Sequence, residues 1–194
     1  MDKKLKIQII FGSTRQNRQG EKVAKWVVSE AKHREDWAVE FLDLRDWPLP
    51  FFDEVGSPSD LRGNYSSEIA KKWAAKVGEA DGYIIITPEY NHGYPAVLKN
   101  ALDYAYAEWV RKPVAFVSYG GSSGGARSVE QLREVVSELE MAGVRSAIHM
   151  VYFRREFDDT GKLKDEITWN KRLGTVFDDL VWWTKALKSA RSSS

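Results

Sequence analysis

Residues able to bind a phosphate are concentrated in one short loop near the start of the chain. The segment "GSTRQNRQG" carries Ser13, Arg15 and Arg18 and ends at Gly20, where a helix-like segment begins. The first turn of a helix presents unpaired amides and a partial positive charge, and arginine can contact a phosphate through two hydrogen bonds at once. The alternative without a ligand is an ordinary turn whose arginines are solvated. We interpret the loop as a phosphate site.

A second polar loop, "PEYNHGYP", follows the apolar run "GYIIIT", and a third, "GGSSGGAR", follows "VAFVSY". The second loop crowds two prolines, a glycine and two tyrosines into one turn. The third is rich in glycine and small residues, so a flat group could lie close to its backbone. Together these two loops favour a slot for a planar ligand.

The third loop also contains a G-x-S-x-G pattern at Gly120, Ser122 and Gly124, which is typical of serine hydrolases. Such an enzyme needs an acid and then a histidine downstream. His149 is the only histidine after Ser122, no aspartate lies between them, and its apolar surroundings favour a core position. Hydrolysis through Ser122 is therefore kept only as a remote alternative.

Composition narrows the chemistry further. The 194-residue chain has no cysteine, so thiolate nucleophiles, disulfides and thiolate metal sites are excluded, and redox chemistry would need a cofactor. The three histidines are scattered, and no metal site is expected. With 29 basic and 28 acidic residues, the net charge of +1 indicates no nucleic-acid partner and makes any anion site local.

Five apolar segments rich in β-branched residues alternate with five segments of helical spacing, which predicts a β-α repeat with the strands covered on both faces. The expected strands are Lys6–Phe11, Val39–Leu44, Tyr83–Thr87, Val114–Tyr119 and Ala147–Phe153. The expected helices are Gly20–His33, Tyr65–Glu79, Pro95–Glu108, Ala126–Ala142 and about Ile167–Lys188. Right-handed crossovers then favour a doubly wound α/β fold, a five-stranded parallel sheet of order 2-1-3-4-5 with helices on both faces.

In a sheet of this order, ligands bind beyond the carboxyl ends of the strands, where the strand order reverses between the first and third strands. The three polar loops follow the first, third and fourth strands. We therefore expect all three loops to gather at one site.

The chain reads as one domain over residues 1–190, with a polar tail at 191–194 expected to be disordered. Its first apolar run is too short for a signal peptide, and no segment approaches the length of a membrane span. A cytoplasmic location without membrane partners is expected.

With "GSTRxxRxG", "PEYNHGYPAVLKNALDYA" and "VSYGGSSGG" at this order and spacing, the chain resembles the NAD(P)H-dependent FMN reductase family from about Lys6 to Val151. That resemblance implies a flavodoxin-like fold, FMN as cofactor and NAD(P)H as co-substrate. The family includes quinone, azo-dye and chromate reductases.

The resemblance also implies which residues contact FMN. The phosphate would be held by Ser13, Arg15 and Arg18, together with the backbone amides up to Gly20 and Glu21. The ring would lie along the second and third loops, against Pro88, Glu89, Tyr90, Asn91, Gly93, Ser118, Tyr119, Gly120 and Gly121. No side chain is assigned a catalytic role, because the chemistry would take place on the flavin.

The expected activity is a two-electron, ping-pong transfer of a hydride from NAD(P)H through FMN to quinones, azo compounds or similar acceptors. A flavodoxin-type single-electron carrier and a non-catalytic FMN-binding protein are the alternatives. The balanced charge and the arginines of the first loop favour the enzyme, since such carriers dock through acidic surfaces. The preference between NADH and NADPH stays open.

A homodimer or homotetramer is also expected. In "PAVLKNALDYAYAEW", Tyr104 and Tyr106 fall outside the apolar face predicted to cover the sheet, which suggests a second contact. The alternative is that both tyrosines are simply half-exposed.

Overall fold

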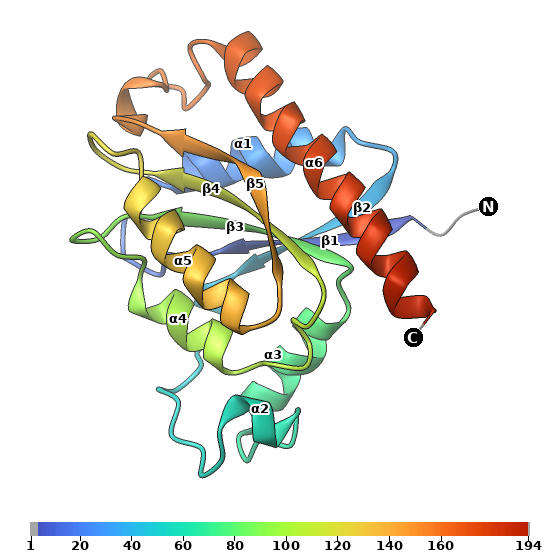
Figure 1. The fold of residues 1–194 in the computed structure, drawn as a ribbon. Coiled ribbons are helices and arrows are strands. Elements are labelled where there is room, and N and C mark those ends of the chain that lie inside the picture. Colours follow the sequence, from blue (N-terminus) through green and yellow to red (C-terminus); the bar gives the residue numbers. More distant parts are fainter. Residues whose placement is uncertain (1–3, 194) are drawn as a thin grey trace.

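The computed structural model describes residues 4–193 and has a five-stranded parallel sheet of order β2-β1-β3-β4-β5 (Figure 1). The predicted fold class and strand order are confirmed. The strands are β1 (Leu5–Phe11), β2 (Trp37–Asp43), β3 (Gly82–Pro88), β4 (Pro113–Tyr119) and β5 (Ala142–Met150).

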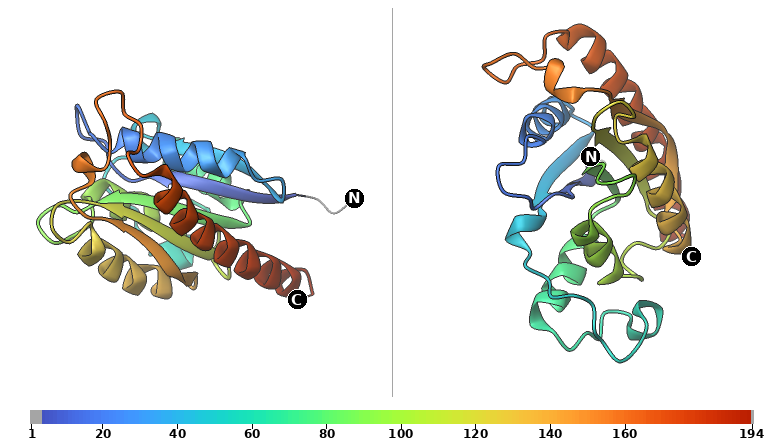
Figure 2. Two further views of the ribbon diagram at one scale, coloured as in Figure 1. Left: turned by 90° about the horizontal axis from the view of Figure 1, so that it is seen from above. Right: turned by 90° about the vertical axis from the view of Figure 1, so that its left-hand side faces the viewer.

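Helices cover both faces of the sheet, as the two turned views show (Figure 2). They are α1 (Glu21–Lys32), α2 (Pro58–Leu61), α3 (Glu68–Gly78), α4 (Ala96–Asp103), α5 (Ala126–Glu138) and α6 (Glu166–Ser192), with short 3-10 helices η1 (Leu44–Asp46) and η2 (Phe153–Arg155). Side chains of α1 and α6 pack on one face, and those of α3, α4 and α5 pack on the other.

The central strands supply both cores, because their successive side chains point to opposite faces. In β3, Ile84 and Ile86 join the α1 and α6 side, whereas Tyr83 and Ile85 join the other. Every residue of β3 and β4 is buried. This explains why their sequences are continuously apolar rather than alternating.

Strand β5 differs from its predicted range of 147–153, since it runs from Ala142 to Met150. It is an edge strand with alternating exposed and buried residues, so its first half lacks the continuous apolar signature. It ends at Met150 because Tyr152 adopts a left-handed backbone conformation (φ 44°) that turns the chain into η2. The segment after Met150 is thus a loop at the carboxyl edge of the sheet.

Helix α4 ends at Asp103, earlier than predicted, and this changes the role of the next residues. The Tyr104 side chain is fully buried, lies 5.1 Å from the ring of Phe52, and donates a hydrogen bond to the carbonyl of Phe51. Tyr106 packs partly against the same core and donates to Glu140. Tyr104 therefore gives no support for a second contact, because the irregular segment after η1 folds back over it, and Tyr106 is half-exposed, as the alternative expected. Oligomerisation stays a prediction without that support.

The C-terminal helix continues into the segment expected as a tail. Arg191 and Ser192 form its last turn, and the Arg191 guanidinium donates to the carbonyl of Arg111. Ser194 lies outside the described residues. No helix in the described part of the chain is both long and apolar enough to cross a membrane.

Candidate functional site

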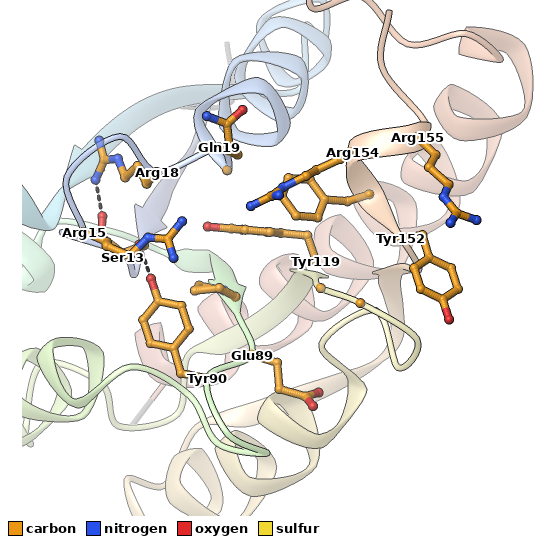
Figure 3. A pocket seen from close by; sticks show the side chains of 15 residues that line it. Ser13, Arg15, Arg18, Gln19, Glu89, Tyr90, Tyr119, Tyr152, Arg154 and Arg155 are labelled. Atoms are coloured by element: carbon orange, nitrogen blue, oxygen red, sulfur yellow. Dashed lines mark hydrogen bonds between the residues drawn. The ribbon is translucent and has the colours of Figure 1, made fainter.

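The three polar loops meet at a pocket of about 390 Å³ beyond the carboxyl ends of the strands (Figure 3). Ten of the residues predicted for the site line this pocket: Ser13, Arg15, Arg18, Gly20, Pro88, Glu89, Tyr90, Tyr119, Gly120 and Gly121. Four others, Glu21, Asn91, Gly93 and Ser118, lie beside it in supporting positions. The expected gathering of the loops is therefore found in the fold.

Arg18 lines the pocket, but its guanidinium is committed to other groups of the protein. It forms a bidentate pair with Asp43 at the end of β2, and it also donates to Glu21 and to the carbonyl of Ser13. The guanidinium carbon of Arg18 lies 4.2 Å from the centre of the Phe11 ring, and Arg18 is 7% exposed. Arg18 thus joins the first loop to β1 and β2.

The contacts between Arg18 and its carboxylate partners also shift the pKa values of Asp43 and Arg18. Burial alone would raise the pKa of Asp43, but hydrogen bonds from Arg18 and from the Arg45 amide lower it below its usual value. Burial would lower the pKa of Arg18, and the hydrogen bonds and charges of Asp43 and Glu21 instead raise it. Glu21 also pairs with Arg45. Both members of the central pair are therefore ionised at neutral pH.

Arg15 is the guanidinium of the first loop that remains available. Its side chain is exposed, and among residues 4–193 it has no carboxylate partner. Its backbone carbonyl accepts a hydrogen bond from Arg45, which holds the loop. Beside it, the buried Ser13 hydroxyl lies 2.9 Å from the Tyr90 hydroxyl and connects the first loop to the second.

The second loop is a tight hairpin turn. Tyr90 and Gly93 exchange two backbone hydrogen bonds, of 2.8 and 3.0 Å, around Asn91 and His92. Both central residues have positive φ (50° and 71°), the geometry of a two-residue turn of type I′. Asn91 and Gly93 therefore shape the turn, while Tyr90 reaches back to the pocket.

Glu89 belongs to the second loop and has a structural role, because its carboxylate contacts residues at the start of α5. It forms an ion pair with Arg127 and accepts a hydrogen bond of 2.8 Å from the Ser123 hydroxyl. Burial alone would raise the pKa of Glu89, but these contacts lower it. The residue stays ionised and ties the second loop to the third, which does not suit a proton donor.

The third loop supplies backbone surface. A methyl group added at Gly121 would meet nothing within 4 Å, so the backbone there is open to a ligand. Ser118 is fully buried and hydrogen-bonded to the carbonyls of Gly124 and Ile148. Its Oγ lies 2.7 Å from Nδ1 of His149.

The position of His149 corrects the sequence interpretation. It is not a core histidine but an exposed residue of the edge strand, with one ring nitrogen against Ser118. Partial burial and the nearby Arg133 lower its pKa. His149 contacts the buried Ser118 rather than Ser122. The structure therefore does not bring together the serine and histidine that a hydrolase acting through Ser122 would need.

Sequence reasoning missed five residues of the pocket: Gln19, Tyr152, Phe153, Arg154 and Arg155. Four of them follow β5: Tyr152 and Phe153 lie within the range predicted for the strand, 147–153, and Arg154 and Arg155 come directly after it. The available signal was the pair of arginines in "VYFRREF", which comes directly after the predicted end of the strand at Phe153. Because the carboxyl ends of parallel strands share one edge of the sheet, this pair indicated a fourth loop at the site.

The donor groups of the pocket fit a phosphorylated planar cofactor. Ser13, Arg15 and the first turn of α1, which no side chain caps, are suited to a phosphate. Gly120 and Gly121 offer a backbone surface beside them for a flat ring. A phosphate site adjoining an open glycine backbone suits FMN, which carries one phosphate and a flat ring.

Comparison with known proteins agrees with this geometry. The family model of NADPH-dependent FMN reductases matches residues 5–154. An NAD(P)H-dependent FMN reductase of Schizosaccharomyces pombe is 40% identical over 171 residues, which is 88% of this chain and 84% of that protein. A 2-hydroxy-1,4-benzoquinone reductase of a Burkholderia species is 30% identical over 93% of this chain and 97% of that protein.

Among solved structures, the flavoenzyme NAD(P)H:(acceptor) oxidoreductase of Paracoccus denitrificans superposes with a TM-score of 0.72 at 25% identity, covering 94% of this chain and 98% of that one. The fold and the pocket thus define a flavodoxin-like oxidoreductase. The chain belongs to the family of NADPH-dependent FMN reductases.

Proposed function

We propose that this protein transfers a hydride from NAD(P)H, through bound FMN, to small flat acceptors such as quinones and azo compounds. The observation that carries the proposal is a single pocket in which the phosphate-type groups Ser13 and Arg15 adjoin the backbone of Gly120 and Gly121, which is open at Gly121. When bound, FMN supplies the hydride chemistry by accepting two electrons from the donor and passing them on.

The residues of this chain would then bind and orient. Ser13, Arg15 and the amides at the start of α1 would hold the phosphate, and the glycine loop would support the ring. The Glu89–Arg127 pair holds the second loop against α5, so the slot keeps its shape. No acid or base is assigned, since Glu89 stays ionised in its ion pair and Ser118 is buried.

Steady-state kinetics test this proposal. Both NAD(P)H and the acceptor must lie against the same open side of the slot, so they are expected to bind in turn. Initial-rate measurements with NADPH and a quinone should give parallel double-reciprocal lines, with excess quinone competing against NADPH. Intersecting lines would require both substrates to bind together and would contradict the shared slot. Binding of FMN without any NAD(P)H oxidation would favour the carrier or the non-catalytic alternative.

A second experiment tests the role of Arg15. Its replacement by alanine should weaken FMN binding about tenfold, because a charged hydrogen bond to phosphate is worth about 1.5 kcal/mol at an exposed position. Riboflavin, which lacks the phosphate, should bind the variant and the parent protein equally. Fluorescence titration with both ligands measures the difference, and equal losses for FMN and riboflavin would remove Arg15 from the phosphate site.

A further inference from the structure

The pocket has a second group of cations opposite the first loop. Arg154 and Arg155, in η2, are both exposed and both line the pocket. Among residues 4–193 neither guanidinium has a carboxylate partner within ion-pair distance, whereas Arg18 is fully engaged by Asp43 and Glu21. Two uncompensated guanidinium groups at a pocket wall are suited to an anionic ligand.

These arginines are held by the glycine loop of the site. The Tyr152 amide donates to the carbonyl of Gly121 at 2.8 Å, and the Phe153 amide donates to that of Gly120 at 3.3 Å. The Phe153 ring packs 4.9 Å from the ring of Tyr119. The backbone of η2 is therefore fixed to the slot, and this preorganisation lowers the cost of binding a ligand.

Arg15 and Arg155 lie on different sides of the pocket (Figure 3). In Figure 3, Arg15 lies beside Ser13 on one side, Tyr152 and Arg155 lie on the other, and Tyr119 stands between them. Arg154 extends from η2 over Tyr119. FMN carries a single phosphate, and the first loop already provides for it in the function proposed above. The second group of cations is then left without an anion from the cofactor.

We propose that Arg154 and Arg155 form a second phosphate subsite, which binds the phosphate groups of the NAD(P)H co-substrate. The inference rests on the proposed function. Next to this subsite, the Tyr152 ring is 48% exposed and lies 4.8 Å from the Arg155 guanidinium carbon. An exposed aromatic ring beside a guanidinium is a surface on which a flat base can stack, as the adenine of a dinucleotide would.

The test is the double substitution Arg154→Ala, Arg155→Ala in the FMN-loaded protein. NADP⁺ and NAD⁺ affinities are measured by calorimetry, and kcat/KM is measured with NADPH and with NADH. We expect at least about a tenfold loss of NADP⁺ affinity and of kcat/KM for NADPH, the effect of losing one charged hydrogen bond. The loss should shrink at high salt, because exposed charges are screened.

A matched control is Arg172→Ala. This arginine is also exposed and without a carboxylate partner among the described residues, and it lies 5.1 Å from the centre of the Trp169 ring, but it is outside the pocket. This substitution removes one positive charge without touching the site. It should therefore leave the affinities for NADP⁺ and NAD⁺, and kcat/KM for NADPH and NADH, unchanged. The variant Arg154→Lys, Arg155→Lys should recover part of the affinity, since the charge remains.

The outcomes separate the possible sources of the phosphate. A loss for NADPH and NADP⁺ alone would assign the subsite to the 2′-phosphate, and equal losses for both dinucleotides would assign it to the diphosphate that they share. Unchanged binding of both would overturn the proposal. So would a loss of FMN affinity with riboflavin affinity preserved, because the arginines would then serve the cofactor. If the parent protein binds NADP⁺ but oxidises neither donor, the proposed function fails and the subsite stands.

Discussion

Replacing Arg18 with methionine is expected to lower the free energy of unfolding by about 3 kcal/mol. The substitution leaves Asp43, whose side chain is 17% exposed, without its bidentate partner, and it removes the donor to the Ser13 carbonyl. Breaking a buried ion pair from one side typically costs about 3–5 kcal/mol, and the partial exposure of Asp43 places this case at the low end. Urea unfolding of the cofactor-free protein measures the change.

Two further variants make the Arg18 prediction specific. Arg15→Met removes the same charge from the same loop at an exposed position, and should change stability by less than about 0.5 kcal/mol. Adding Asp43→Asn to Arg18→Met should recover part of the lost stability, because no uncompensated charge then remains. Equal destabilisation by Arg15→Met and Arg18→Met would contradict the structural role of Arg18.

The Arg18–Asp43 ion pair also predicts that the free energy of unfolding depends on pH. Asp43 has a lower pKa folded than unfolded, so the folded chain binds fewer protons there. Its stabilisation is therefore complete above the ordinary pKa of 3.8 and is lost as the pH falls through the folded pKa. The stability difference between the parent protein and Arg18→Met should shrink below about pH 4. A difference that stays constant down to pH 2 would exclude this linkage.

Replacing Gly20 with alanine is expected to destabilise the protein by about 2 kcal/mol and to weaken FMN binding. A methyl group at this position would lie 2.0 Å from the hydroxyl oxygen of Tyr119 and 2.2 Å from its ring carbon Cζ. Tyr119 is 4% exposed and packed against Phe153, so its ring must move within a filled space. Overpacking of this kind costs about 1–3 kcal/mol. Thermal unfolding and FMN titration of the variant measure both effects.

A control substitution separates the clash from the loss of glycine itself. Gly174 lies within helix α6, and a methyl group there would meet nothing within 4 Å. Gly174→Ala should therefore stabilise the protein by about 0.5–1 kcal/mol, as glycine is a poor helix residue. In a Tyr119→Leu background, Gly20→Ala should cost much less than in the parent. An undiminished cost in that background would show that Tyr119 is not the obstacle.

The sequence predicted the sheet and the meeting of the loops well, and the reasons are physical. The inner strands are covered on both faces, so their apolar runs are unbroken and easy to recognise in β3 and β4. Once five such runs alternate with helices, the handedness of the crossovers restricts the strand order. The gathering of the first three loops follows from that order, because the carboxyl ends of parallel strands share one edge.

Tertiary structure decided what individual side chains do. Arg15 and Arg18 share a loop and a residue type, but only Arg18 meets Asp43, which lies 25 positions away in sequence. On the predicted helix Tyr104 falls outside the apolar face, but in the structure a distant segment covers it. Likewise, the arginines after β5 face the pocket because a left-handed turn at Tyr152 ends the strand. Local periodicity carries no information about such long-range partners, and these partners determine which charges remain free to bind a ligand.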